Sequence, residues 1–189
     1  MKKHNGMRPQ DVVIILKLIT QTKSKISEKK SNFSFNEILE NQNKNIAKSL
    51  EMSEAEVSES LRRSEYAGLI SDKKTKQVNQ RAVLEFLLHG IKYVFPIHPG
   101  AMVRGIPTAH SALPISNNIV SDELFVWEHS EGTVRGQAII PLYHTVPNIV
   151  QNDEKLYELL ALIDAIRTGT ARINKIASEE LEKRILTGW

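Results

Sequence analysis

A repeating pattern of apolar positions predicts that the first half of the chain is helical. Apolar residues recur at helical spacing from about residue 8 to residue 22, and Pro9 suits the first turn of such a helix. Similar stripes predict helices over residues 36–50, 53–66 and 79–95. The pattern therefore indicates four amphipathic helices in the first 95 residues.

The segments between these stripes predict turns and one hairpin. The polar run NQNKN is expected to divide residues 36–50 into a short helix and a second one that begins near Lys44. A tight turn follows, and Ser53 with Glu56 has the spacing of a capping box, in which each side chain bonds to the backbone of the other residue. Residues 69–79 then have the form of a small hairpin with the basic tip DKKTK.

The composition changes after residue 95. Six of the seven prolines lie within residues 96–147, which excludes long helices there. The short runs LFVW and GQAII are expected to be strands that pair through the SEGT turn. Residues 153–186 show two further apolar stripes, which predict a helical hairpin. We therefore expect a mainly α fold with small β elements, with one domain over 1–95 and a second over 96–189.

Composition and charge narrow the functional classes. The chain of 189 residues has 41% hydrophobic residues and no cysteine, which excludes disulfides and thiolate sites and favours a cytoplasmic location. The apolar run VVIILKLI is too short for a membrane span. The first 95 residues carry 17 basic and 11 acidic side chains, and the remaining residues carry 8 and 11. This asymmetry favours a basic part that faces a polyanion.

The segment NIAKSLEMSEAEVSESLRRSEYAGLI resembles the core of bacterial winged helix-turn-helix transcriptional regulators of the MarR and ArsR type. In those families a helix that ends in Leu precedes a short turn, a Val-Ser-x-x-Leu recognition helix and an Ala-Gly-Leu-Ile exit into the wing. The resemblance covers residues 44–80 closely and residues 8–95 by the order of elements. The chain departs from it at Ser64, where these families usually have Leu, and in the long stretch before Ile46. The segment YVFPIHPGAMVRGIPTAH resembles a part of uncharacterised winged-helix proteins.

The helix 53–66 and the hairpin tip supply the candidate DNA-binding residues. With Val57 and Leu61 on the buried side, the helical repeat places Arg62 and Arg63 on the outward face, which a DNA groove would meet. Glu59 either accepts a hydrogen bond from a cytosine amino group or pairs with the two arginines. The lysines of the hairpin tip are placed to reach phosphates or a minor groove. The candidate set is Ser53, Ser58, Glu59, Arg62, Arg63, Lys73, Lys74 and Lys76.

Basic and histidine side chains in the loop-rich segment form a second candidate site, for a ligand or a protein partner. They are His98, Arg104, His110, Arg135 and His144. The alternative is that these residues only hydrogen-bond within the loops and order them. No HExxH motif, phosphate-binding loop or nucleophile with a neighbouring base is present, so neither a metal, a cofactor nor an enzymatic activity is expected.

These observations predict a sequence-specific regulator of transcription that binds double-stranded DNA, as a homodimeric repressor. A single winged helix covers one half-site, and we expect residues 153–186 to supply the dimer contact. The alternative is a protein-interaction module, such as an autoregulating antitoxin that neutralises a partner toxin. A further alternative is a ligand sensor whose pocket is formed by residues 96–147.

Overall fold

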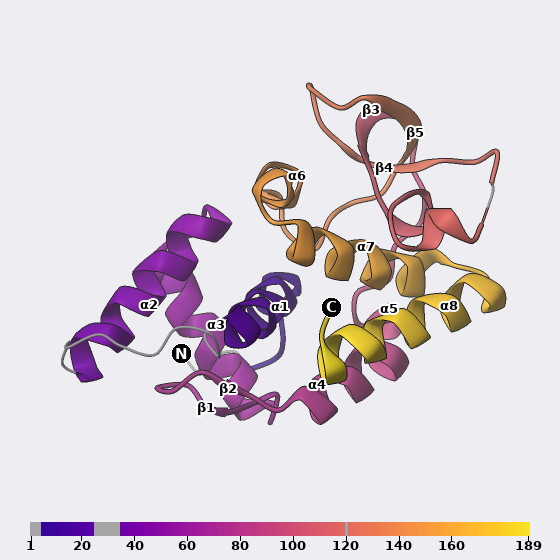
Figure 1. Cartoon of the computed structure of the whole chain (residues 1–189). Coiled ribbons are helices and arrows are strands. Elements are labelled where there is room, and N and C mark those ends of the chain that lie inside the picture. The colour runs from indigo at the N-terminus through magenta and orange to yellow at the C-terminus, as the bar shows by residue number, and fades with distance from the viewer. Residues whose placement is uncertain (1–4, 25–34, 120) are drawn as a thin grey trace. The chain divides into compact units, whose positions relative to one another are not determined.

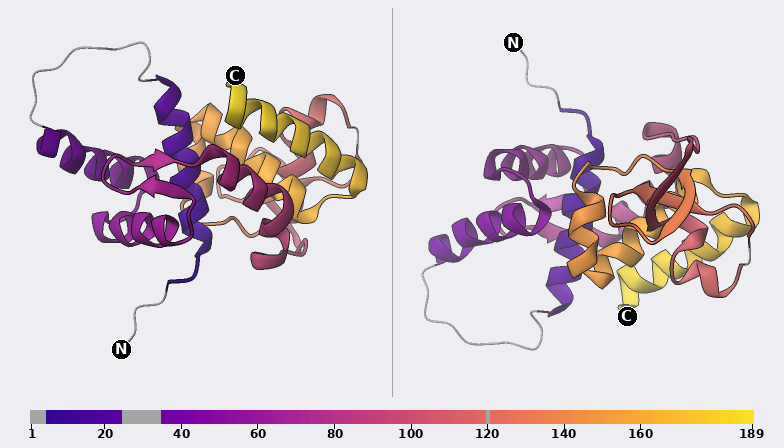
Figure 2. Two further views of the ribbon diagram at one scale, coloured as in Figure 1. Left: turned by 90° about the horizontal axis from the view of Figure 1, so that it is seen from below. Right: turned by 90° about the horizontal axis from the view of Figure 1, so that it is seen from above.

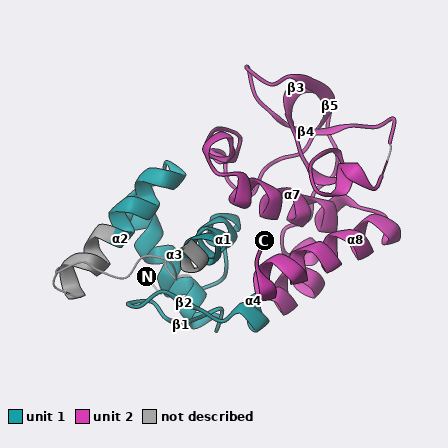
Figure 3. Cartoon of the chain, viewed as in Figure 1, with its two compact units in different colours: residues 1–83 teal, residues 84–189 magenta. Residues whose placement is uncertain are grey.

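The chain is mainly helical, with one sheet of two strands and one of three. The computed structural model describes residues 5–24, 35–119 and 121–189 (Figure 1). The chain divides into two compact units, Met1–Val83 and Leu84–Trp189 (Figure 3). We expected a boundary after residue 95; the division falls earlier, inside the fourth predicted helix.

The first unit has the order of elements that the apolar pattern predicts. Its elements are α1 (Pro9–Ser24), α2 (Phe35–Leu50), α3 (Glu54–Tyr66), β1 (Ile70–Asp72) and β2 (Gln77–Val78). Helices α1 and α2 both pack against α3, and β1 and β2 form an antiparallel hairpin. The expected break near Lys44 is wrong, because α2 continues through the NQNKN run.

Side chains from α2 and α3 build part of the core of this unit. Ile46, Leu50, Val57 and Leu61 are all buried. Complete burial of such a side chain stabilises the folded state by about 1.5–3 kcal/mol. The burial of these side chains therefore stabilises the helix by more than the polar NQNKN run in the middle of α2 destabilises it. The apolar spacing, rather than the local polarity, therefore decides where the helix ends.

The fourth helix is present but is not regular. It consists of α4 (Gln80–Glu85), a π-helical turn over Phe86–Gly90 and α5 (Ile91–Val94). The side chain of Asn79 accepts a hydrogen bond from the amide of Ala82 and so caps the start of α4. The last part, α5, packs against a helix of the second unit, which explains why the division precedes residue 95.

The loop-rich segment contains a closed sheet of three short strands. These are β3 (Met102–Pro107), β4 (Phe125–Glu128) and β5 (Val134–Ala138). Both predicted strands are confirmed, but they are parallel rather than a hairpin, and β3 pairs antiparallel with each of them. Gly105 of β3 is the partner of both Glu128 and Val134. A Cβ atom at Gly105 would overlap the carbonyl oxygen of Trp127, so glycine is required where the sheet closes.

The predicted helical hairpin is confirmed at the C-terminal end. Helices α7 (Glu154–Thr168) and α8 (Ala171–Glu182) lie side by side, and a π-helical turn over Lys183–Thr187 follows (Figures 1 and 2). The shorter helical elements are 3-10 turns at Ala109–Ser111, Ile115–Asn117 and Val150–Asn152, and α6 (Val146–Ile149).

The apolar side of α7 is covered within the chain itself. Its residues from Leu159 to Ile166 are all buried. We expected a dimer contact here because two free helices would leave large apolar stripes exposed. On the hairpin and its C-terminal extension, the large apolar side chains with substantial exposure are instead Leu186 and Trp189, at 41% and 44%. Burial within the monomer therefore removes the reason for placing the dimer contact on this hairpin.

A buried carboxylate ties the three-stranded sheet to α7. Asp164 accepts hydrogen bonds from Thr108 Oγ1 at 3.1 Å and from Trp127 Nε1 at 2.7 Å, and it forms an ion pair with Arg167 at 2.7 Å. Arg167 also donates to the carbonyl oxygen of Phe95. Burial raises the pKa of Asp164, and the three donors supply the contacts that a buried carboxyl group needs.

Candidate nucleic-acid interface

Helices α2 and α3 are joined by a turn of three residues. Glu51 has a φ of 52°, in the left-handed region, and Ser53 is the N-cap of α3. The predicted capping box is confirmed: the amide of Glu56 donates to Ser53 Oγ at 3.2 Å, and the amide of Ser53 donates to Glu56 Oε2 at 3.0 Å. The cap fixes the first turn of α3 and places the Glu56 carboxylate at the end of the helix that favours negative charge.

The outward face of α3 contains most of the residues that the helical repeat assigns to it. Ala55, Ser58 and Tyr66 are exposed, and Glu59 and Arg62 are half-buried. Val57 and Leu61 lie on the buried side, as expected. Ser64 is also buried. It therefore lies on the packed side of the helix, at the position where the regulators that this segment resembles usually have Leu.

Arg63 is the exception, because it turns inward. Its side chain forms two contacts with Asp11 of α1, Nε to Oδ2 at 2.8 Å and Nη2 to Oδ1 at 2.5 Å. The two residues are only 4% and 0% exposed. The hydrogen bond to Asp11 raises the pKa of Arg63 further above its ordinary value. The expectation that Arg63 faces outward is therefore wrong, and its guanidinium group instead joins α3 to α1.

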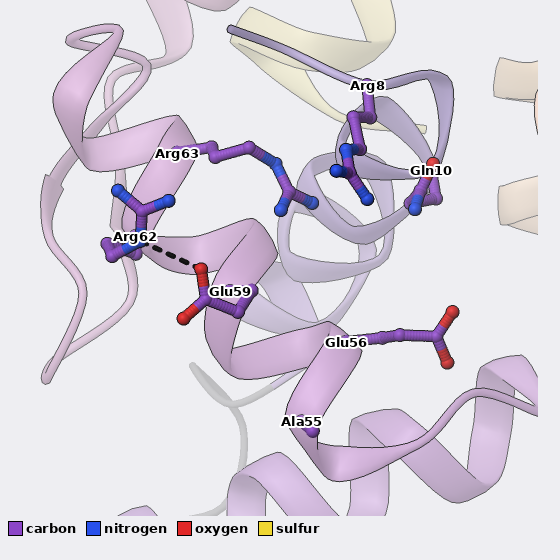
Figure 4. A pocket seen from close by; sticks show the side chains of 7 residues that line it. All are labelled: Arg8, Gln10, Ala55, Glu56, Glu59, Arg62 and Arg63. Atoms are coloured by element: carbon purple, nitrogen blue, oxygen red, sulfur yellow. Dashed lines mark hydrogen bonds and ion pairs between the residues drawn. The ribbon is translucent and has the colours of Figure 1, made fainter. Parts of the chain in front are cut away.

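Side-chain contacts hold Arg62 at the surface. Its Nε lies 2.9 Å from Glu59 Oε2, one turn earlier on α3 (Figure 4). Its Nη1 donates to Asn5 Oδ1 at 2.7 Å. Of the two interpretations of Glu59, pairing with an arginine is the one observed, and its partner is Arg62. The outward face thus carries an arginine whose charge is already compensated.

The hairpin brings two of its three lysines to the surface. Lys73 and Lys74 are exposed, and Lys73 Nζ lies 3.0 Å from Glu65 Oε2 of α3. The hydrogen bonds from Lys73 lower the pKa of Glu65. Lys76 is different: it is 7% exposed, has a φ of 55° and donates to Gln42 Oε1 at 3.4 Å. The hairpin tip therefore presents Lys73 and Lys74, while Lys76 packs inside.

A hollow of about 300 Å³ lies beside the outward face of α3 (Figure 4). We call it the α1–α3 hollow; it is lined by Arg8, Gln10, Ala55, Glu56, Glu59, Arg62 and Arg63. Arg8 immediately precedes α1, Gln10 lies in its first turn, and the other five come from α3. The sequence pattern did not identify Arg8, because it is about fifty residues from α3 and no local motif connects the two.

The five candidate residues of the loop-rich segment differ in exposure and in the contacts they make. Arg104 and Arg135 are exposed and occupy partner positions on β3 and β5. His98 is exposed. His110 is buried; its Nε2 lies 2.7 Å from the carbonyl oxygen of Glu123, and its ring packs edge-on against Phe125.

His144 lines a hollow of the second unit. This hollow of about 310 Å³ is largely apolar. It is lined by Glu128, Ala138, Ile139, Ile140, Pro141, His144 and Pro147.

Two kinds of feature are not found within residues 5–24, 35–119 and 121–189. No three His, Asp or Glu side chains gather in a way that could hold a metal ion. No helix there is both long and apolar enough to cross a lipid bilayer.

Comparison of the chain with protein-family models, with curated proteins and with solved structures found no match. Arguments about function therefore rest on the residues and their geometry.

Proposed function

We propose that the chain is a sequence-specific regulator of transcription that binds double-stranded DNA through α3 and the β1–β2 hairpin. One observation carries the proposal. Helix α3 follows α2 after a three-residue turn, presents Ser58 and Arg62 outward, and packs beside a hairpin whose tip carries exposed Lys73 and Lys74. This combination supports the proposal, because a helix of this kind suits the major groove and neighbouring cations suit the flanking phosphates.

The ion pair of Arg62 does not prevent such a role. An exposed or partly exposed pair within one helix contributes only about 0.3–0.5 kcal/mol. A bidentate contact from arginine to guanine discriminates against the wrong base by about 1–3 kcal/mol. A guanine edge can therefore replace Glu59 as the partner of Arg62, and the exposed Ser58 on the same face can bond to a base or a phosphate.

The hairpin lysines provide the first test of the proposal. A duplex is selected from a random pool with the wild-type chain, and its affinity is measured by fluorescence anisotropy over a range of salt concentrations. Lys73→Glu/Lys74→Glu should weaken binding to every duplex. It should also flatten the slope of log K against log salt by at least about 1.8, because each lost phosphate contact removes about 0.9.

The matched control is Lys175→Glu/Lys183→Glu, which makes the same charge change at two exposed lysines of the second unit. It should leave the slope close to that of the wild type. An equal loss in both double variants would mean that only net charge matters, and no loss in either would remove the hairpin from the interface.

We further propose that the chain acts as a homodimeric repressor. One α3 covers a single half-site, and useful specificity at physiological salt usually needs two. The proposal requires that the selected duplex contains two related half-sites and that light scattering gives a mass of two chains per duplex. One chain on a single half-site would contradict it.

A second candidate, a protein-interaction module such as an autoregulating antitoxin, is favoured by the acidity of α3. On or beside its outward face Glu59 pairs with Arg62 and Glu65 with Lys73, whereas the exposed Glu54 has no basic partner within 4 Å among the described residues. A face of this charge suits a basic protein partner. Glu54→Lys should then abolish partner binding, whereas under the DNA proposal the same variant should strengthen binding to duplexes.

A further inference from the structure

Three arginines line the α1–α3 hollow, and two of them are compensated. Arg62 is paired with Glu59 and Arg63 with Asp11. Arg8 is exposed, and among the residues that the structure describes its guanidinium group has no carboxylate within 4 Å. Figure 4 shows its side chain directed into the hollow from the start of α1. Arg8 is therefore the cation of this hollow that is available to an anion from outside.

Buried contacts fix the backbone of Arg8 relative to α3. The amide of Arg8 donates to Asp11 Oδ2 at 2.8 Å, and the amide of Asp11 donates to the carbonyl oxygen of Arg8 at 2.9 Å. The same Asp11 carboxylate binds Arg63 of α3. Loss of either partner would leave a buried charge without compensation, so the fold favours keeping this arrangement intact. An incoming ligand would need to order only the Arg8 side chain.

The acids that line the hollow are themselves engaged. Glu59 is held by Arg62, and Glu56 accepts from both the amide and the hydroxyl of Ser53. Ala55 has only a methyl group at this point, which leaves the space between α1 and α3 open. Gln10 adds an amide group, which can donate hydrogen bonds, on the side of Arg8. The hollow thus combines one uncompensated cation, one neutral donor and room for a small anionic group.

We propose that the α1–α3 hollow seats a backbone phosphate of the bound duplex. Arg8 is its charged ligand, and Asp11 and Arg63 are the residues that position Arg8 beside α3. This inference rests on the proposed function, because the phosphate belongs to a duplex whose groove is occupied by α3. It assigns Arg63 a role that differs from the sequence expectation, since the residue acts through Asp11 and does not touch DNA.

A phosphate contact makes a quantitative prediction for Arg8→Ala. The variant should bind the selected duplex and a scrambled duplex more weakly by the same factor, because phosphates carry no sequence information. Its slope of log K against log salt should be lower by about 0.9. The ratio of wild-type to variant affinity should therefore shrink about 3.5-fold when the salt concentration rises fourfold. Arg8→Lys should keep the wild-type slope.

The control variant is Arg172→Ala, which removes an exposed arginine from α8. It should leave the slope unchanged. Arg8→Ala should also keep the wild-type midpoint of thermal unfolding, because the Arg8 side chain is exposed and the contacts with Asp11 use its backbone. A lowered midpoint would instead make Arg8 part of the core and would contradict the proposal.

The outcomes separate this inference from the proposed function. If the wild-type chain binds no duplex, the proposed function fails and the phosphate seat with it. If the wild type binds but Arg8→Ala has the wild-type affinity and slope, only the seat is overturned. A loss confined to the selected duplex would mean that Arg8 reads a base.

Inorganic phosphate at matched ionic strength distinguishes a free anion from the DNA backbone. It should compete with the duplex no better than chloride does, for the wild type and for Arg8→Ala alike. Thermal stabilisation of the wild type alone by inorganic phosphate, without any effect of Arg8→Ala on DNA binding, would assign the hollow to a free anion and overturn the proposal.

Discussion

At the residue scale, Glu59 and Arg63 show what a helical repeat can and cannot predict. The spacing of Ser53 and Glu56 predicted the capping box because both partners lie within one turn. The inward turn of Arg63 was not predictable, because its partner Asp11 is 52 positions away and no local pattern indicates it. Long side chains can leave the face to which their Cα atom belongs. Glu59, by contrast, pairs within its own helix, which its spacing from Arg62 allows.

The substitution Glu59→Gln tests what this carboxylate does. The glutamine keeps the shape of the side chain but removes a negative charge and weakens the hold on Arg62. We expect a higher affinity for selected and scrambled duplexes alike, measured by anisotropy, because an acid near phosphates opposes binding. Glu179→Gln, at an exposed position of α8 in the second unit, makes the same charge change outside the proposed interface and should have a smaller effect. A loss for the selected duplex alone would show that Glu59 accepts a hydrogen bond from a base.

At the scale of elements, local periodicity predicted the helices better than the sheet. The ends of α7 and α8 follow from apolar stripes and from the stop at Gly169. Strand β3 was missed because its sequence MVRGIP contains Gly and Pro and shows no clear alternation. The parallel pairing of β4 and β5 was also missed, because it depends on β3 as the antiparallel partner of both strands. Pairings of this kind between distant segments leave no local signal.

A tyrosine joins the sheet to α7 and gives the second unit a pH dependence. Tyr157 donates to the carbonyl oxygen of Pro107 at 2.8 Å, and its ring packs edge-on against Trp127. Burial raises the pKa of Tyr157 from 10.0 to about 12. The folded state therefore holds this proton more tightly than the unfolded state does. The corresponding stability is fully present below pH 10.0 and is lost as the pH rises to about 12.

Tyr157→Phe should lack this part of the decline in the free energy of unfolding between pH 10.0 and about 12. Urea titrations across that range measure the free energy of unfolding. Tyrosinate absorbance shows whether Tyr157 is the group that loses its proton. Tyr93→Phe is the control, because it removes the hydroxyl group of a tyrosine that is 73% exposed and should leave the decline between pH 10.0 and about 12 in place. Identical high-pH absorbance steps in the wild type and in Tyr157→Phe would contradict the assignment.

At the scale of the whole molecule, charge follows the two compact units. Residues 1–83 carry 16 basic and 10 acidic side chains, whereas residues 84–189 carry 9 and 12. The excess of basic side chains in the first unit does not lie on the outward face of α3. On that face Arg62 is paired with Glu59, and several acidic side chains lie on or beside it. Under the proposed function, attraction to DNA would come from positions around that face, such as Arg8 and the hairpin lysines. The sequence predicted the two-part organisation and its charge but placed the boundary later than the packing does.

The central claim is that α3 reads a DNA sequence, and the ratio of affinities for the selected and scrambled duplexes tests it most directly. At physiological salt the wild-type chain should prefer the selected duplex by at least about 10³. Arg62→Ala should reduce that preference by about 1–3 kcal/mol, because it removes a contact to a base edge. Equal affinities for the two duplexes, or an unchanged preference in Arg62→Ala, would contradict the account.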